Sequence, residues 1–441
     1  MKLSRQDDDM FVGFRIKLRP SKNQIKTFEK YFGMARYFYN LALGIINEKF
    51  QSYRTGEKRS WGVSKYDLTK RLSELRKLPE NKWMYDYDLG SERTAMFSAV
   101  DAVDRFNKMR FNINAYYKTK RDKSDSTFIR SDRVRVFSNK VVVSSIGEIN
   151  TEKHEYDTNE IRRRKQRLPY GSVMIVRFCG EYWLTGVERK PKPTSRVLDC
   201  EVSDVVGIDV NMSDADWIID SDHTVVSKPN TKRIDEKIEI LQRRYIHKVC
   251  VNDSRFVRGD NQTSRRERTK REEKLRTKLQ KAHRHRANMF KDKIYKYAKD
   301  LMMRNPAAVV MEDLSCLTLI EKHKEERKYD KSFNSKMFDS RTYDIRMTIR
   351  NKCDEYCIPL LQADRTYPST QLCSVCGHRF TGENKLKLSD RVYRCPECGS
   401  EIDRDLNSTF NLKYLGWSYL GDPNFPESHN EYKDDYEVLH S

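Results

Sequence analysis

The sequence predicts a multidomain α/β protein, and three observations support this fold class. The chain has 441 residues, more than one hydrophobic core usually organises, and this length predicts about two to four domains. Helical, strand-rich and alternating stretches follow one another along it. Four of its ten cysteines form two tight pairs, Cys373-x2-Cys376 and Cys395-x2-Cys398, which have the spacing of a zinc ribbon.

Basic residues outnumber acidic ones, with 86 Lys and Arg against 65 Asp and Glu and a formal charge of +21. Such an excess attracts a polyanion, and nucleic acid is the expected partner. No apolar run approaches the roughly 18 residues of a membrane span, and the N-terminus lacks a signal-peptide pattern. We therefore expect a soluble cytoplasmic protein with no membrane partner.

An extended run at residues 11–18 opens the chain and ends at Arg19 and Pro20. Ser21 is a suitable N-cap for the helix that follows. Apolar residues then recur with helical period at Ile25, Phe28, Phe32, Ala35, Phe38, Ala42 and Ile46, and again at Met96, Val100, Val103 and Phe106. Residues 21–120 are therefore expected to form a helical domain.

Strand signals replace helical ones between residues 128 and 189. Turns containing Asn, Gly or Pro separate the runs at 134–137, 141–143, 172–176 and 182–185. These runs predict a β-barrel or an open sheet. The strand at 11–18 has no local partner, so we expect it to pair with this sheet, which makes the helical domain an insertion. The Lys- and Pro-rich stretch at 190–194 is the expected linker.

Strand and helix alternate in the remainder of the chain. The expected elements are a strand at 205–210, a hairpin of 217–219 with 224–226, a long basic helical region, a strand at 307–311, a helix and a strand at 358–364. This order is the ribonuclease-H-like pattern of α/β folds. In that arrangement Asp209 and Glu312 lie on strands that can be neighbours, and Asp405 begins a closing helix.

Asp209, Glu312 and Asp405 follow apolar runs or start a helix, whereas most acidic residues are solvated surface charges. Burying an acid among Val, Gly and Ile is costly unless a metal or a cation neutralises it. Two Mg²⁺ ions at a phosphodiester need several carboxylate oxygens. We therefore take these three acids as candidate catalytic Mg²⁺ ligands. Asp403 is the better N-cap, and Asp313 should face the other side of its strand.

The four cysteines are the strongest isolated signal. Gly377 and Gly399 follow the two pairs and allow the tight turns that direct amides at thiolate sulfur. In a reducing cytosol this pattern favours a closed, structural zinc site over disulfides. The module is also expected to help hold nucleic acid, because three basic residues lie between its pairs: Lys385, Lys387 and Arg391.

Two basic stretches are candidate nucleic-acid contacts. The helical region 243–297 has one apolar stripe and an opposite basic face. A shorter cluster lies in a loop of the strand-rich part. A solvated charged face is the plain alternative for such runs, and phosphate contacts alone do not read sequence. The candidates are Arg162, Arg163, Arg164, Arg265, Arg266, Lys270, Arg271, Lys278 and Arg284.

These motifs, in this order, resemble the TnpB family of transposon-encoded RNA-guided nucleases, which is related to the compact type V CRISPR effectors. The resemblance rests on Gly207-Ile208-Asp209-Val210, Val310-Met311-Glu312-Asp313-Leu314, the two cysteine pairs and Asp403-Arg404-Asp405-Leu406-Asn407. The N-terminal stretches 18–24 and 35–42 are also similar to that family. The resemblance therefore spans nearly the whole chain, although Asn211 replaces a usual glycine and Ser408 and Thr409 replace small alanines.

The resemblance implies a β-barrel wedge domain interrupted by a helical recognition domain, then a RuvC (ribonuclease-H-like) nuclease domain that holds the zinc ribbon. The implied bounds are 1–20 and 121–195 for the wedge, 21–120 for the recognition domain, 196–366 and 401–420 for RuvC, 367–400 for the ribbon and 421–441 for an acidic, flexible tail.

The same resemblance implies a guide RNA from the same locus and a double-stranded DNA target beside a short flanking motif. It implies Mg²⁺-dependent cleavage at one RuvC site formed by Asp209, Glu312 and Asp405. The location would be a prokaryotic cytoplasm, with nucleoid association when bound to DNA. A monomer and a homodimer on one guide RNA remain open.

Two other functions are weighed beside this one. A DNA-binding regulator that is RNA-guided or zinc-dependent, but does not cleave, predicts the loss of at least one acid, and all three are present. A DNA transposase would use similar carboxylates for transesterification, but the position of the ribbon before the last acid fits the TnpB arrangement better.

Overall fold

The computed structural model describes residues 9–56, 62–108, 116–119, 124–137, 139–152, 170–191, 204–252, 268–312, 340–387, 390–421, 427–433 and 435–439. They belong to two compact units, Met1–Lys192 and Pro193–Ser441. The division falls inside the expected linker at 190–194. The last strand of the first unit reaches Pro191, so the linker begins later than the sequence suggested.

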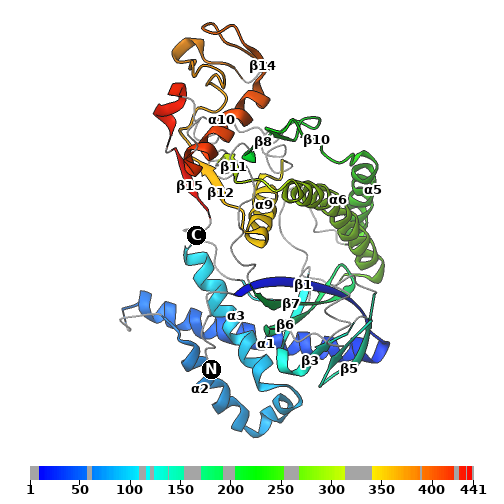
Figure 1. Ribbon diagram of the computed structural model, residues 1–441. Coiled ribbons are helices and arrows are strands. Elements are labelled where there is room, and N and C mark those ends of the chain that lie inside the picture. Colours follow the sequence, from blue (N-terminus) through cyan, green and yellow to red (C-terminus); the bar gives the residue numbers. More distant parts are fainter. Residues whose placement is uncertain are drawn as a thin grey trace. The chain divides into compact units, whose positions relative to one another are not determined.

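Among its described residues, the first unit combines one antiparallel sheet with the α-helices α1, α2 and α3 (Figure 1). Its elements are β1 (Asp9–Arg19), α1 (Lys22–Arg54), α2 (Lys65–Lys77), the 3₁₀-helix η1 (Pro79–Asp86), α3 (Leu89–Lys108), β2 (Ser124–Arg130), η2 (Ser131–Arg133), β3 (Val134–Val136), β4 (Lys140–Val143), β5 (Gly147–Thr151), β6 (Tyr170–Phe178) and β7 (Glu181–Pro191).

The sheet has the strand order β2-β6-β7-β1-β5-β4-β3. Strand β1 pairs with β7 along nearly its whole length and with β5 through Leu18 and Arg19. The prediction that the first strand joins this sheet is therefore confirmed, and the helices are inserted between strands. Within the described residues no pairing of β2 with β3 closes the sheet into the predicted barrel.

Helix α1 begins where the sequence indicated. The Ser21 hydroxyl accepts from the backbone N–H of Gln24, and the Gln24 side chain accepts in return from the Ser21 backbone N–H. This capping box satisfies two donors that a helix start leaves free. Its buried side, including Phe38, packs against Leu68 of α2 and Met96 of α3 to form the core of the helical part.

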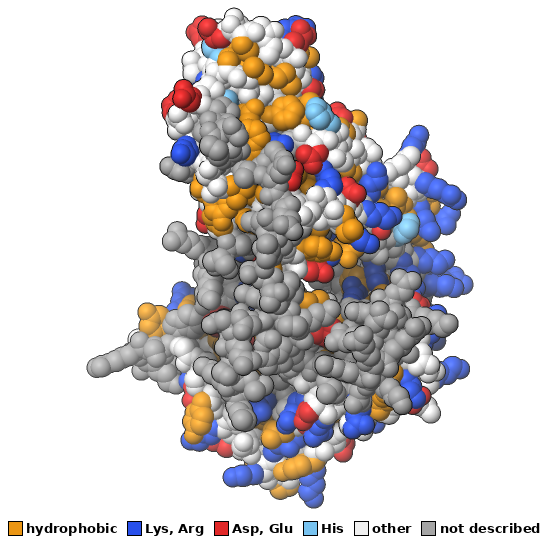
Figure 2. Space-filling model, in the orientation of Figure 1, with side chains coloured by type: hydrophobic (Ala, Val, Ile, Leu, Met, Phe, Trp, Pro, Cys, Tyr) orange, Lys and Arg blue, Asp and Glu red, His pale blue; other side chains and the backbone are white. Residues whose placement is uncertain are grey.

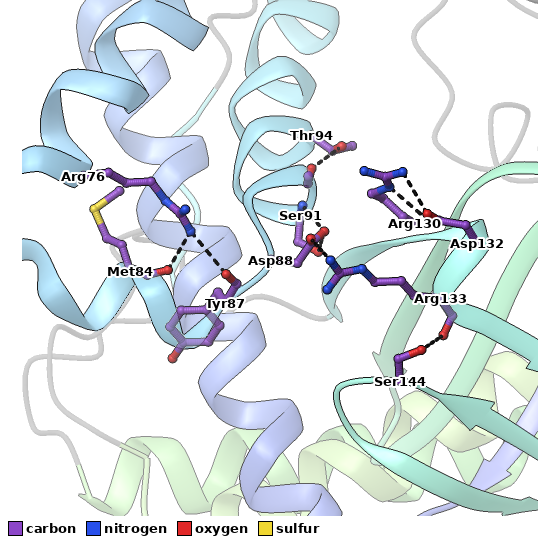
Figure 3. Close-up of polar contacts among 11 residues, drawn as sticks. Arg76, Met84, Tyr87, Asp88, Ser91, Thr94, Arg130, Asp132, Arg133 and Ser144 are labelled. Carbon is purple, nitrogen blue, oxygen red and sulfur yellow. Dashed lines mark hydrogen bonds and ion pairs between the residues drawn. The ribbon is translucent and has the colours of Figure 1, made fainter. Parts of the chain in front are cut away.

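Polar contacts stabilise the helical part and link it to the strand-rich part within this unit (Figure 3). The Arg76 guanidinium donates to the carbonyls of Met84 and Tyr87 at 2.9 and 3.2 Å. Asp88, at the start of α3, accepts from the Ser91 backbone N–H and pairs with Arg133 of the sheet part at 3.1 Å. The half-buried ion pair therefore links the insertion to the strand-rich part.

The second unit is built on a mixed sheet with the order β10-β9-β8-β11-β12-β15. Its elements are β8 (Val206–Val210), β9 (Ile218–Asp220), β10 (Val225–Val226), α5 (Lys232–Asn252), α6 (Lys270–Met303), β11 (Val309–Glu312), α9 (Thr342–Tyr356), β12 (Leu360–Ala363), η4 (Gly382–Asn384), β13 (Val392–Arg394), β14 (Glu401–Asp403), α10 (Arg404–Leu420), η5 (Glu427–Tyr432) and β15 (Tyr436–Val438).

Strands β8, β11 and β12 are parallel, whereas β9 and β15 run antiparallel to their neighbours. Strand, hairpin, helix, strand, helix and strand therefore follow in the predicted order. In its described residues the long basic region contains the helices α5 and α6, and residues 253–267 between them lie outside the described part of the chain.

Helix α10 lies directly against β8. A Cβ atom placed on Gly207 would come within 2.1 Å of the Thr409 carbonyl oxygen, so only glycine permits this approach. The close contact brings the first turn of α10 toward the strand that carries Asp209. Leu412 and Leu415 of the same helix complete a core with Val205, Val310 and other buried apolar side chains.

The C-terminal residues are packed, and the expected flexible tail is wrong for the part that the structure describes. His429 and Tyr432 of η5 are buried, with 1% and 7% of their surface exposed. Strand β15 pairs with β12 and becomes the edge of the sheet. Aromatic side chains and free backbone groups at a sheet edge stabilise this packing despite the acidic composition.

No helix among the described residues is long and apolar enough to cross a membrane.

Candidate metal centres

Three acidic side chains from three elements lie near enough in the second unit for their charges to interact. Asp209 lies in β8, Glu312 ends β11, and Asp405 lies in the first turn of α10. Strands β8 and β11 are parallel neighbours, so their carboxyl ends share one edge of the sheet. The charges of Glu312 and Asp405 both act on the Asp209 carboxyl.

Asp209 is buried, with 5% of its surface exposed. Burial raises the pKa of its carboxyl well above the usual range, and the negative charges of Glu312 and Asp405 raise it further. Burial also raises the pKa of Glu312. The Ser369 hydroxyl donates a hydrogen bond to the Glu312 carboxylate and partly offsets this increase. A site that destabilises two ionised carboxylates favours a proton or a cation beside them.

Asp405 has two basic neighbours. Nη2 and Nε of Arg404 donate to its Oδ1 at 3.0 and 3.2 Å, and Nη1 of Arg391 lies 3.5 Å from its Oδ2. Asp403 accepts from the backbone N–H groups of Asp405 and Leu406, each at 3.0 Å, which confirms its prediction as the N-cap of α10. The carboxylate of Asp403 is therefore engaged by the helix.

The donor set suits a hard divalent cation, because carboxylate oxygens are the ligands that Mg²⁺ prefers. In the described residues, the four cysteines form the one group of potential metal ligands whose ligand atoms all lie within 4.8 Å of one another. The oxygens of the three carboxylates do not all lie this close together. Like charges repel, and Arg404 and Arg391 attract Asp405 to their own side. Carboxylates around a pair of ions about 4 Å apart need not touch one another.

The four predicted cysteine ligands do come together. The sulfurs of Cys373 and Cys398 are 3.8 Å apart, and those of Cys376 and Cys395 are 3.4 Å apart. Zinc–sulfur bonds of about 2.3 Å at tetrahedral angles place sulfurs about 3.8 Å apart. The cluster therefore fits a closed zinc site with no open coordination position.

Backbone amides support the same site. Gly377 and Gly399 have φ angles of 75° and 71°, the left-handed turns expected after each pair. The Ser400 hydroxyl lies 3.1 Å from Sγ of Cys398 and, with the Ser400 amide, lowers the pKa of that thiol to about 6. Hydrogen bonds to sulfur favour the thiolate, which is the form that binds zinc.

Asn407 and Asn411 join the ribbon to α10, and sequence reasoning assigned neither a role. The Asn407 amide donates to the Leu372 carbonyl at 2.7 Å and accepts from the Ser374 N–H at 2.9 Å. The Asn411 amide donates to the carbonyls of Ser369 and Leu372, each at 2.8 Å. Their spacing of four residues on one helix face was the signal that could have identified them.

The basic candidates divide into two groups. Arg162, Arg163, Arg164, Arg265 and Arg266 lie outside the described residues. Lys270, Arg271, Lys278 and Arg284 lie on α6, where the first three are exposed and Arg284 is half-buried.

Helix α6 packs on α5 through an apolar seam that includes Leu241 and Ala282. Asp235 of α5 also pairs with Arg286 of α6 at 2.7 Å. Figure 2 shows Lys and Arg side chains gathered over this helix pair. The described part of the basic region therefore presents a rigid, positively charged surface.

Two family models match parts of the chain. The model of the Cas12f1-like TNB domain matches residues 343–412, which include the cysteine cluster and Asp405. A model described as a helix-turn-helix domain matches residues 10–55, where the structure has β1 and α1.

Two relatives match nearly the whole chain. A putative RNA-guided DNA endonuclease of Streptomyces pristinaespiralis is 23% identical over 416 residues, covering 91% of this chain and 89% of the relative. The putative RNA-guided DNA endonuclease InsQ of Escherichia coli K12 is 22% identical over 422 residues, covering 92% of both chains.

One solved structure, a Cas12f1–sgRNA–target DNA complex, has a protein chain similar in fold, with a TM-score of 0.50 and 11% identity. The match covers 92% of this chain and 99% of that chain. This protein thus has a compact, type V-like multidomain α/β fold and resembles the TnpB-like RNA-guided DNA endonucleases over nearly its whole length.

Proposed function

We propose that this chain is an RNA-guided DNA endonuclease that cleaves double-stranded DNA beside a short flanking motif. The guide would be an RNA from the same locus. The relatives named as RNA-guided endonucleases support this function along about nine-tenths of the chain. The net charge of +21 suits a protein that holds both an RNA and a DNA.

The observation that carries the proposal is the position of Asp209. Its buried carboxyl is faced by two further carboxylates, and its ionised form is destabilised by both burial and charge. A fold maintains such an arrangement at a cost to stability, which is typical of a catalytic metal site. Asp209, Glu312 and Asp405 would hold the Mg²⁺ ions, the proposed RuvC site.

With Mg²⁺ held by Asp209, Glu312 and Asp405, the site would supply activation of water and stabilisation of the leaving oxygen of the phosphodiester. The chain's own residues orient the ligands. Ser369 fixes one oxygen of Glu312 through its hydroxyl, and Arg404 fixes Oδ1 of Asp405. The Arg391 side chain is 63% exposed, so its guanidinium, which already interacts with Asp405, would also be accessible to a DNA phosphate.

Domain assignments complete the proposal. The strand-rich part of the first unit would be the wedge domain and its helices the recognition domain. In the second unit, the mixed sheet with α10 would be the RuvC domain, and residues 367–400 would be the zinc ribbon. The zinc role is structural, because four cysteines leave no open position on the ion.

The test is to express the chain with its native flanking DNA, purify it and sequence the RNA that accompanies it. A discrete species with a constant scaffold and one variable end supports RNA guidance and supplies a target for cleavage assays with Mg²⁺. Heterogeneous host RNA, together with no cleavage of targets that match the flanking locus, would reject the guided model.

The Mg²⁺ requirement should depend on pH. Because burial and neighbouring carboxylates raise the pKa of Asp209, the metal-free site binds a proton more readily than an ordinary aspartate, and Mg²⁺ must compete with that proton. The Mg²⁺ concentration for half-maximal cleavage should therefore rise as the pH falls from about 8 to about 6. Magnesium titrations at several pH values measure this, and a constant half-maximal concentration would contradict the proposed protonation.

The exposed face of α6 should contribute to nucleic-acid affinity through phosphate contacts. Replacing Lys278 by Ala should weaken RNA binding and reduce the slope of log affinity against log salt by about one. The control is Lys296→Ala on the same helix, because Lys296 already pairs with Asp292 at 2.7 Å. Equal salt slopes for Lys278→Ala and the unchanged protein would exclude this contact.

A further inference from the structure

The C-terminal residues 427–433 and 435–439, here called the C-terminal clasp, lie beyond the range that the TNB-domain model matches. The clasp contacts three parts of the second unit. These are the first cysteine turn around Gly377, helix α10 and strand β12. A segment that touches the ribbon, the helix of Asp405 and the sheet can fix their relative positions.

The first cysteine turn is held closely by the clasp. A Cβ atom on Gly377 would lie 2.3 Å from the carbonyl oxygen of Ser428, so the clasp backbone rests directly on this glycine. Two residues further on, Nη1 of Arg379 donates to the Tyr432 hydroxyl at 3.0 Å. Gly399 occupies the same place in the second cysteine turn, but among the described residues no heavy atom lies within 4 Å of its Cβ position.

His429 connects the clasp to α10. The two N–H groups of the Asn411 amide are used by the carbonyls of Ser369 and Leu372, so its Oδ1 faces His429 and accepts from Nε2 at 3.3 Å. With its proton on Nε2, a neutral imidazole leaves Nδ1 as an acceptor. The hydroxyl of Ser428 lies 2.9 Å from Nδ1 and is placed to donate to it.

The same contacts continue to a candidate metal ligand. Ser369, whose carbonyl accepts from Asn411, donates through its hydroxyl to the Glu312 carboxylate. Tyr432 packs edge-on against Tyr367 at 5.7 Å, and Tyr367 donates to the Asn411 carbonyl at 2.8 Å. The clasp thus contacts Asn411 and Tyr367, and Asn411 in turn holds Ser369, the partner of Glu312.

The clasp is also attached to the sheet. Strand β15 pairs with β12, and the Asp364 N–H donates to the Asp435 carbonyl at 2.9 Å. The Leu439 N–H donates to the Leu360 carbonyl at 2.9 Å, while its own carbonyl accepts from Arg350 at 3.1 Å. One end of the clasp is therefore anchored on the sheet that carries the acids, and the other rests on the zinc ribbon.

We propose that the C-terminal clasp positions the first cysteine turn and Ser369 relative to Glu312, and that His429 is a positioning residue for DNA cleavage. This inference rests on the proposed function. Loosening the clasp should slow the chemical step, because a small displacement of a catalytic group lowers rates on the order of 10- to 100-fold. Guide-directed DNA binding and zinc content should be retained.

The two glycines provide a matched test in the full-length chain with its guide RNA. Gly377→Ala and Gly399→Ala impose the same backbone strain, because both residues have a positive φ, but only the first collides with the clasp. Gly377→Ala should lower the single-turnover cleavage rate at least about tenfold more than Gly399→Ala. In a His429→Leu background, which weakens the clasp, the difference between the two variants should shrink.

His429→Gln is the conservative variant, because its amide N–H can replace Nε2–H as donor to Asn411. It should retain most of the rate that His429→Leu loses, with zinc stoichiometry and DNA affinity unchanged in both. Equal rates for the two glycine variants, or a loss in His429→Gln as large as in His429→Leu, would overturn the proposal.

A readout independent of cleavage separates this inference from the proposed function. Zinc transfer to a chromophoric chelator should be faster for Gly377→Ala than for Gly399→Ala, because the released first cysteine turn opens more often. If no guide-matched DNA is cut by the unaltered protein, the proposed function fails, and zinc transfer alone decides the clasp. Equal transfer rates would then reject it.

Discussion

Replacing Asp209 by Asn is expected to abolish DNA cleavage while leaving guide-directed DNA binding intact. The substitution removes the charge of a proposed metal ligand but keeps the shape of the side chain. Metal ions contribute several kcal/mol to stabilising a phosphodiester transition state, so the rate should fall by about 10³-fold or more. Single-turnover cleavage and filter binding of the same target measure the two effects separately.

The same variant should alter the pH dependence of stability in the metal-free protein. The folded Asp209 has a raised pKa, so the folded state binds more protons than the unfolded state between the ordinary Asp pKa of about 4 and the raised value. The free energy of unfolding therefore falls as the pH rises through this window. Asp209→Asn should lose most of that slope, which urea unfolding at about pH 5 and pH 8 would reveal.

Asp220 provides the matched control on the neighbouring strand β9. It is fully buried like Asp209, but its carboxylate accepts from Tyr297 at 3.0 Å, from Arg304 at 2.8 Å and from two backbone N–H groups. Asp220→Asn should therefore destabilise the protein by about 1–3 kcal/mol, because it weakens a satisfied buried network.

The contrast between the two aspartates decides the assignment. If Asp209→Asn cleaves at the rate of the unaltered protein, Asp209 is not a metal ligand. If Asp209→Asn destabilises as Asp220→Asn does, with no change in the pH slope, its carboxyl is a structural partner instead.

Local sequence patterns were sufficient to predict the elements that carry the candidate site. Asp209 and Glu312 lie in buried parallel strands. The sequence of such a strand is a continuous apolar run, so a single acidic residue within it is easily identified. Asp403 and Asp405 could be distinguished because an N-cap has a defined hydrogen-bonding role. The zinc ligands could likewise be predicted from the two cysteine pairs, because zinc geometry constrains the spacing of the cysteines.

Contacts between distant segments could not be predicted in the same way. Helix α2 was missed because only Leu68 and Leu72 of its side chains are buried, too few to give a clear helical period. The packed C-terminal residues were missed for a related reason. His429 and Tyr432 are buried by contacts with α10 and the ribbon, and these contacts with distant segments cannot be predicted from the acidic composition of the C-terminal residues.

Replacing Cys395 by Ser should release zinc and unfold the ribbon while the nuclease sheet stays folded. The core of the ribbon is small and consists largely of its own ligands, with Cys373, Tyr393 and Cys395 as its fully buried members. Metal binding contributes about 10–16 kcal/mol to the folding free energy of small zinc modules, so this core should unfold without the metal. The hydrogen bonds of β8, β11 and β12 are separate from the ribbon and should persist.

Cleavage should fall at least about 100-fold in Cys395→Ser, because an unfolded ribbon no longer holds Arg391 beside Asp405 or Ser369 beside Glu312. Hydrogen exchange should show the loss of protection confined to residues 367–403. Cys353→Ser is the control, since Cys353 is equally buried but lies in α9, away from the zinc ligands. It should keep full zinc content, and a Cys395→Ser protein that still cleaves at the normal rate would show that the ribbon does not support the acidic site.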